Sequence, residues 1–476
     1  MDRSILKTLS GLALLGFVFT GPRLPACPQS GPIPQHEVTT WLAKSAHPLK
    51  TVEAGKSFQD LLPLKSILKD VQIVGLGEGS HGTREFFQLK HRLLEFLVKE
   101  MDYRLFVVEV SYASSLAIND YVLHGKSAKE LDNIKRPWPM DTQEWNGLIE
   151  WMREYNRTVP PTRKVKFFGY DTKPNRRTME LVTDYLKRVA PEKIEFARNS
   201  LSPIVDEPEK ELDLAVTLPN AGRPQRTETE RKQIRDRLEA LMNLFATNQA
   251  MFVRGTSMHE FNRVVHAVRT VLQYDDVFSR TWVSQTDPLN TGIAVREIYA
   301  AQNLERLLKE ERPGSRVVLW AHNGHVSRGY VYASVPTMGS FLSKTFRGSY
   351  YAMALIFNRG SFQARNLDAE DSQYGAVLEF SLGPAAEGTV EWYLSKSGVK
   401  DCYLDVRTSP QEGAIADWLK SPIPMKYLLG GGFSRRWPPG AYTRPIVLRQ
   451  YYDGVAFINE TSRARPNPSG IRGPAR

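Results

Sequence analysis

Residues 71–83 form the sequence VQIVGLGEGSHGT, which joins two segments of different apolar pattern. The apolar run from Val71 to Leu76 predicts a short buried strand, and the apolar spacing from Phe86 to Val98 predicts a helix. Glu78 and His81 then lie on a Gly-rich turn between the end of a strand and the start of a helix. Open α/β sheets bind their ligands at such a crevice.

Two interpretations of this turn remain open. In the first, Glu78 orients the His81 imidazole, which exchanges protons near neutral pH, while the glycines bring the backbone close to a ligand. In the second, the turn is architectural, and Ser80 or Thr83 caps the helix. Other segments of the chain bear on this choice.

Further strand ends carry titratable side chains. Apolar strands are predicted to end at Glu109, at Asp171 and just before His322 and His325. Helical patterns follow each strand, so the fold class is α/β, with a mostly parallel open sheet flanked by helices. Because the carboxyl ends of parallel strands share one edge, these side chains are expected to converge on one crevice.

The remaining segments predict the domain layout. A signal peptide is expected at residues 1–27, a linker with a leading helix at 28–60, and one α/β domain at 60–460. Long amphipathic helices between about 179 and 290 predict an inserted helical lid region. Residues 461–476 contain a Pro/Gly/Arg-rich tail, for which we expect disorder.

Composition narrows the class of protein. The 476 residues are 41% hydrophobic and carry a net charge of +11. No zinc-finger spacing and no basic helix face with interleaved aromatics occurs, which argues against nucleic-acid binding. Only Cys27 and Cys402 are present, which excludes a disulfide framework and a thiolate metal cluster. Cys402 lies in an apolar run and is expected to be buried.

The N-terminus predicts export to the periplasm or secretion. Arg3 and Lys7 precede an apolar segment, Leu12 to Phe19, that is too short to span a bilayer, and small residues follow. Residues 24–27, LPAC, also resemble a lipoprotein cleavage box, so a lipid anchor at Cys27 and simple secretion both stay open. No later run reaches transmembrane length.

Together, these motifs resemble the erythromycin esterase family. The resemblance rests on GEGSHGT (77–83), EFF (85–87), the strand ending at Glu109, FGYD (168–171) and WAHNGH (320–325), and extends over about residues 60–460. It implies an α/β core with a helical insertion and hydrolysis of carboxylic esters. The best-known members open the lactone ring of macrolide antibiotics and are described as needing no metal.

The resemblance also implies site residues. The family's functional positions fall on Glu78, His81, Glu109, His322 and His325, with a histidine matching His81 activating water. Substrate contacts are expected from these residues: Lys90, Arg136, Asp171 and Asn323. Lys90 stands where macrolide-cleaving members carry arginine, and lysine lacks the planar guanidinium group of arginine. The resemblance therefore predicts the reaction class better than it predicts the substrate.

Two alternatives stay open on the sequence. Three histidines and two carboxylates suit zinc or manganese with a position for water, which predicts a metal-dependent hydrolase. A non-catalytic periplasmic ligand-binding or envelope-biosynthesis protein could also retain such a crevice. The favoured prediction is a hydrolase of small-molecule esters or lactones with no cofactor.

Overall fold

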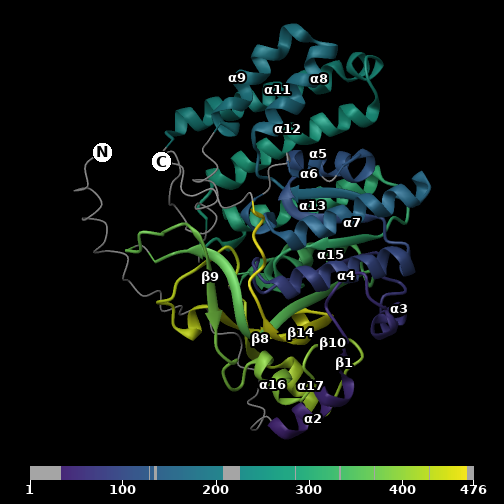
Figure 1. Ribbon diagram of the computed structural model, residues 1–476. Helices are drawn as coiled ribbons and strands as arrows, with labels where there is room; N and C mark the ends of the chain where they lie inside the picture. Colours follow the sequence, from purple (N-terminus) through teal and green to yellow (C-terminus); the bar gives the residue numbers. More distant parts are fainter. Residues whose placement is uncertain are drawn as a thin grey trace. The chain divides into compact units, whose positions relative to one another are not determined.

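A computed structural model describes residues 34–127, 129–132, 137–206, 226–282, 284, 286–331, 334–368, 370–427 and 429–468 (Figure 1). The expected signal peptide, Cys27 and Arg136 lie outside these residues, and so does the last part of the tail. Residues 461–468, the first part of the expected tail, continue a strand and contact residues 83 and 142 through isolated bridges.

One large sheet organises the chain, in the order β1-β10-β14-β8-β2-β5-β3-β4, with β9 and β12 also paired to β8. Two small sheets pair β11 with β13 and β6 with β7. The strands are β1 (His47–Pro48), β2 (Ile73–Leu76), β3 (Leu105–Ser111), β4 (Lys166–Asp171), β5 (Val317–Trp320), β6 (Tyr330–Val331), β7 (Val335–Pro336), β8 (Tyr350–Asn366), β9 (Val377–Leu382), β10 (Cys402–Asp405), β11 (Pro422–Lys426), β12 (Gly432–Phe433), β13 (Thr443–Val447) and β14 (Gly454–Thr461).

Helices connect and cover these strands. They are α2 (Gln35–Ser45), α3 (Pro63–Ile67), α4 (Arg84–Met101), α5 (Tyr112–His124), α6 (Lys129–Asp132), α7 (Gln143–Thr158), α8 (Arg176–Val189), α9 (Ile194–Val205), α11 (Glu228–Arg254), α12 (Met258–Ser279), α13 (Gly292–Glu310), α14 (Asn323–Val326), α15 (Met338–Thr345), α16 (Val390–Lys396), α17 (Gly413–Lys420) and α18 (Leu448–Tyr451).

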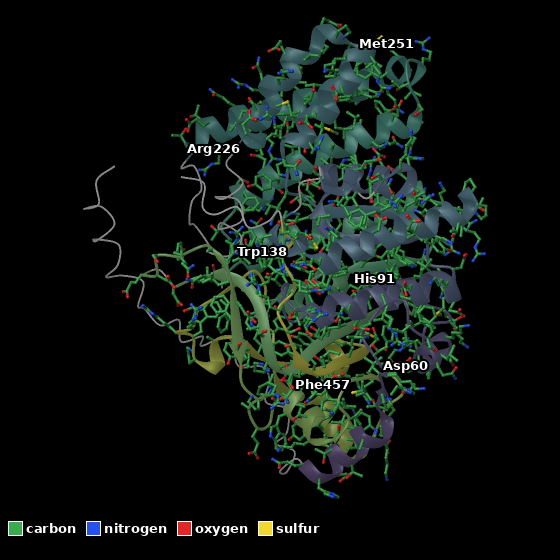
Figure 2. The ribbon with its side chains drawn as sticks, in the orientation of Figure 1. Asp60, His91, Trp138, Arg226, Met251 and Phe457 are labelled. Carbon is green, nitrogen blue, oxygen red and sulfur yellow. The ribbon has the colours of Figure 1, made fainter. Side chains whose placement is uncertain are left out.

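The predicted α/β class is confirmed, and the half of the sheet that holds the expected site is parallel. Strands β14, β8, β2, β5, β3 and β4 pair in parallel with their neighbours. The sheet becomes antiparallel beyond β14. Phe457 marks this junction, since it pairs with Ile356 of β8 on one side and with Cys402 of β10 on the other (Figure 2). Cys402 is a free, buried thiol.

Aromatic packing holds α4 and α7 against the sheet. The rings of Phe87 on α4 and Trp145 on α7 both contact Trp320 of β5, with centroids 5.0 and 5.6 Å apart. All three side chains are at most 1% exposed. Burial of such large rings contributes several kcal/mol each in an upper-limit estimate, so α4, which begins right after the Gly-rich turn, is firmly placed.

The predicted insertion forms its own helical bundle. Figure 1 shows α8, α9, α11 and α12 gathered together. Their apolar faces share a hydrophobic cluster that includes Leu186, Leu201, Leu238 and Val268, all fully buried. Among the described residues, no helix combines the length and the apolar character needed to cross a bilayer.

Candidate active site

The carboxyl ends of β2, β5, β3 and β4 meet at one edge of the sheet, as the parallel register requires. Leu76 pairs with Trp320, and Val108 pairs with both Trp320 and Gly169. The backbone N–H of Asn323 also donates to the Glu78 carbonyl over 2.9 Å. Side chains that are far apart in the sequence therefore reach one edge of the sheet.

Glycine is required in the turn that follows β2. A Cβ atom on Gly77 would lie 2.1 Å from the Asn323 side-chain oxygen, and one on Gly82 would lie 2.0 Å from the Gln363 carbonyl oxygen. Both distances are far inside van der Waals contact. The turn is thus held between the start of α14 and β8, which fixes the positions of Glu78 and His81.

Glu78 is buried between two basic groups. Its Oε1 lies 2.6 Å from His81 Nδ1, and its Oε2 accepts a 2.7 Å hydrogen bond from Lys90 Nζ. Burial raises the pKa of the Glu78 carboxyl, but the Lys90 charge and the His81 hydrogen bond outweigh burial and hold that pKa below its usual value. Glu78 is therefore a carboxylate and accepts a hydrogen bond from His81 Nδ1, which leaves Nε2 as the ring nitrogen that can accept a proton.

Lys90 supports this pair from inside the protein. Its side chain is fully buried, and its ammonium lies 4.1 Å from the centroid of the Trp320 ring. Burial lowers the pKa of Lys90 to about 8, against the attraction of Glu78. Lys90 therefore remains a cation at neutral pH and keeps Glu78 ionised.

His322 has the opposite hydrogen-bonding pattern to His81. Its Nδ1 accepts the backbone N–H of Gly324 over 3.1 Å. Burial, with the nearby His81 and His325, holds the pKa of His322 well below its usual value, so the ring is neutral. Since Nδ1 is an acceptor, Nε2 carries the proton. This Nε2 is buried and has no hydrogen-bond partner among the described residues.

The two rings meet beside Gly430. The His81 and His322 centroids are 5.3 Å apart. A Cβ atom built on Gly430 would lie 3.6 Å from His81 Nε2 and 3.7 Å from His322 Nε2. One point in space thus lies close to a proton acceptor and to a proton donor at once, which is the arrangement that general-base catalysis with oxyanion stabilisation needs.

A second cluster of charges lies next to this pair. Arg296 donates from Nη2 to Glu109 and to Asp171, at 3.0 Å each. Burial raises the pKa of both carboxyls. For Glu109 the charges of His325 and Arg296 outweigh burial and hold the pKa well below its usual value. For Asp171 the Arg296 charge outweighs burial and lowers the pKa. Both acids are therefore ionised. Glu109 also accepts the backbone N–H of His322 over 3.2 Å, which connects the two clusters.

His325 carries a fixed positive charge. Its Nδ1 lies 2.5 Å from Glu297, and its Nε2 lies 3.2 Å from both Glu109 and Arg296 Nη1. Burial lowers the pKa of His325, but Glu297 and Glu109 outweigh burial and raise it to about 10. The imidazolium therefore donates from Nε2 to Glu109, and the approach of Arg296 is a contact between two cations that share one acid.

The sequence analysis did not predict Glu297 as a site residue. It is fully buried in α13, and its second oxygen accepts the Met338 backbone N–H over 2.7 Å. It belongs to no motif at a strand end. The only signal in the sequence is an acid at a core-facing helical position, one residue after Arg296.

Three of the residues predicted to contact substrate are bonded to other groups of the protein. Asn323 is fully buried, and its amide is bonded in both directions to the backbone of Leu355. The Lys90 side chain has no exposed surface, and the Asp171 carboxylate forms an ion pair with Arg296. These three side chains are buried and paired within the protein. Arg136 lies outside the described residues.

Several atoms that could ligate a metal ion are already hydrogen-bonded within the protein. Both oxygens of Glu78 are engaged by His81 and Lys90, and Nδ1 of His322 is engaged by Gly324. Among the residues that the structure describes, no group of three His, Cys, Asp or Glu side chains is placed to hold a metal ion. The Glu78 oxygens and this His322 nitrogen therefore already have partners within the protein.

The chain thus has an α/β fold whose sheet carries acid–histidine pairs at its carboxyl edge. Residues 98–461 match the erythromycin esterase family. The chain belongs to this family.

Relatives support the assignment at low identity. The erythromycin esterase type II of Escherichia coli is 22% identical over 388 residues, which span 78% of this chain and 89% of that protein. Among solved structures, a Bacillus cereus protein superposes with a TM-score of 0.75 at 22% identity, covering 92% of this chain and all of that one. A mutant of erythromycin esterase EreC in its open conformation gives 0.66 at 15% identity, over 87% and 97% of the two chains. The structural likeness at this identity concerns the fold.

Proposed function

We propose that this protein hydrolyses carboxylic esters or lactones, with His81 as the general base. The observation that carries the proposal is the complementary pair beside Gly430: an acceptor on His81 Nε2 and a buried donor on His322 Nε2. A water molecule hydrogen-bonded to His81 and a carbonyl oxygen hydrogen-bonded to His322 would bring the reacting atoms together.

The reaction balances with the groups present. His81 Nε2 accepts a proton from water, and the hydroxyl oxygen forms a bond to the ester carbon. The carbonyl electrons move onto its oxygen, which the His322 N–H stabilises. Collapse re-forms the carbonyl and breaks the bond to the alcohol oxygen, which takes the proton back from His81. Glu78 stabilises the intermediate imidazolium and remains ionised because Lys90 lies beside it.

An activity screen of purified protein tests this proposal. Simple esters, lactones and macrolides are incubated with the protein, and the carboxylate product is measured. Turnover of esters supports the proposal, and turnover of macrolides would extend it to the substrate named for the E. coli relative. Failure to hydrolyse any ester, by a folded protein, would favour a ligand-binding role instead.

Gly430→Ala is expected to lower kcat at least tenfold while the fold remains intact. The added methyl group would make only ordinary contacts, 3.6 and 3.7 Å from the two Nε2 atoms, so it needs no rearrangement. It would nevertheless occupy the place where the reacting atoms sit, and small misplacements cost large factors in rate. Steady-state kinetics with a small ester measures this effect. Gly440→Ala, where a Cβ would meet no atom within 4 Å, is the control; equal kcat in both variants would refute the assigned position.

We further propose that hydrolysis needs no metal. Exhaustive chelation, followed by dialysis, is expected to leave the rate within twofold of the untreated protein, because both oxygens of Glu78 and the Nδ1 atom of His322 already have partners within the protein. Turnover and metal content are measured on the same sample, purified without a His-tag. Loss of activity that zinc or manganese restores would establish the metal-dependent alternative.

Export is proposed on the N-terminal sequence alone. The charges at Arg3 and Lys7 and the apolar run to Phe19 predict cleavage, so mature protein from its native host should begin near residue 27. Mass spectrometry of the N-terminal peptide measures this, and also detects a lipid on Cys27. An intact Met1 on cytoplasmic protein would contradict export.

A further inference from the structure

A cavity of about 140 Å³ lies away from the histidine pair, among α5, α12, α13 and β4. Lys166 and residues 168–170 of β4 line it, whereas Asp171, the next residue of that strand, belongs to the candidate active site. The lining residues include none of the side chains His81, His322 and His325. On α13 the lining residues run from Asn303 to Glu310, beyond Arg296.

Three lining side chains have a buried nitrogen without a partner among the described residues. They are Arg263 Nε, His266 Nδ1 and Arg306 Nε. His266 is 6% exposed. Buried polar groups are nearly always hydrogen-bonded, and an unpartnered one costs about 1–3 kcal/mol. Three such nitrogens around one cavity are therefore a reason to look for a ligand that accepts hydrogen bonds.

The charges around the cavity limit that ligand to a single negative charge at most. Arg306 already contacts Glu310 at 2.9 Å, and Arg263 contacts Asp120 at 3.4 Å, so each arginine is partly neutralised. Lys166 is paired with Glu311 at 2.8 Å. A dianion would meet repulsion from these acids, whereas a monoanion would complete the hydrogen bonds of the guanidinium groups.

The rest of the lining is apolar. The Tyr112 ring packs edge-on to His266 with centroids 4.3 Å apart, and Leu116, Phe168 and Leu304 also face the cavity. We propose that this cavity is a second binding site, for a small organic carboxylate whose apolar body packs on Tyr112 and Leu304 while its charge meets Arg263, His266 and Arg306. The site is independent of the proposed ester hydrolysis.

Isothermal titration calorimetry with benzoate tests the proposal on the full chain. Benzoate is expected to bind at one site, and benzamide, its neutral counterpart, at least tenfold more weakly, because charge-assisted hydrogen bonds contribute more than neutral ones. Arg306→Gln and His266→Phe should each weaken benzoate binding at least fivefold. Arg237→Gln, on an exposed position of α11, should bind like the wild type.

Two further titrations separate this cavity from the active site and from a general anion site. Benzoate is also a product of ester hydrolysis, so His81→Ala is titrated in parallel and is expected to bind it unchanged. Loss of binding in His81→Ala, with retention in folded Arg306→Gln and His266→Phe, would place benzoate in the active site and overturn the proposal. Inorganic phosphate binding as tightly as benzoate would overturn the choice of a monoanion with an apolar body.

Discussion

Replacing His81 with alanine is expected to lower ester turnover at least a hundredfold and to leave the fold intact. The substitution removes the acceptor placed beside the His322 donor, and general-base catalysis of this kind contributes roughly 10²–10⁴ in rate. The His81 side chain is 19% exposed and sits on a turn, so its removal leaves no large core cavity. Initial rates on a simple ester, with circular dichroism of the same sample, measure the effect.

His124→Ala is the matched control, because His124 is an exposed histidine at the end of α5. It should retain full activity. Turnover by folded His81→Ala at a rate close to that of the control would show that another group activates water, and Glu109 would then be the next residue to replace.

Arg296→Met is expected to destabilise the protein by about 3–5 kcal/mol. Arg296 is 7% exposed in its side chain and is bonded to Glu109 and to Asp171, so its loss leaves two buried carboxylates without their cation. The free energy of unfolding from urea denaturation measures this change. Asp171→Asn added to Arg296→Met should recover part of the loss, since it removes one of the unpaired charges.

An exposed arginine provides the comparison. Arg157 is 63% exposed and pairs with Glu154 at 3.1 Å, so Arg157→Met should cost less than about 1 kcal/mol. If Arg296→Met and Arg157→Met proved equally stable, the Arg296 cluster would have to be solvated rather than buried.

The strand ends were predictable because their signals are local. Runs such as residues 105–109 and 165–171 are apolar and end in an acid, so both the strands and the positions of Glu109 and Asp171 follow from adjacent residues. The antiparallel pairing of β10 with β1 and β14, and of β9 with β8, was not expected, because strand order depends on pairings between distant segments. The same applies to Gly430, which reaches the histidines from a loop far along the chain.

The roles of individual side chains depend on burial, which the motifs do not encode. Lys90 was expected at the substrate, yet it lies on the inner face of α4 in line with Phe86 and Leu93. That spacing was available in the sequence and indicated a core-facing lysine. The different protonation of His322 and His325 was not available, because it depends on Glu297 and on the surrounding residues.

The order of strands in the sheet has a consequence for how the chain reaches this structure. Ile73 in β2 pairs with Val317 and with Tyr350, each more than half the chain away. At ribosomal speeds of about 5–20 residues per second, the synthesis of β8 follows that of β2 by roughly 15–55 s. Pairings between such distant segments also fold slowly. Under the export proposed above, the chain would thus still be unfolded, and able to thread through a translocation pore, while its C-terminal part is being made.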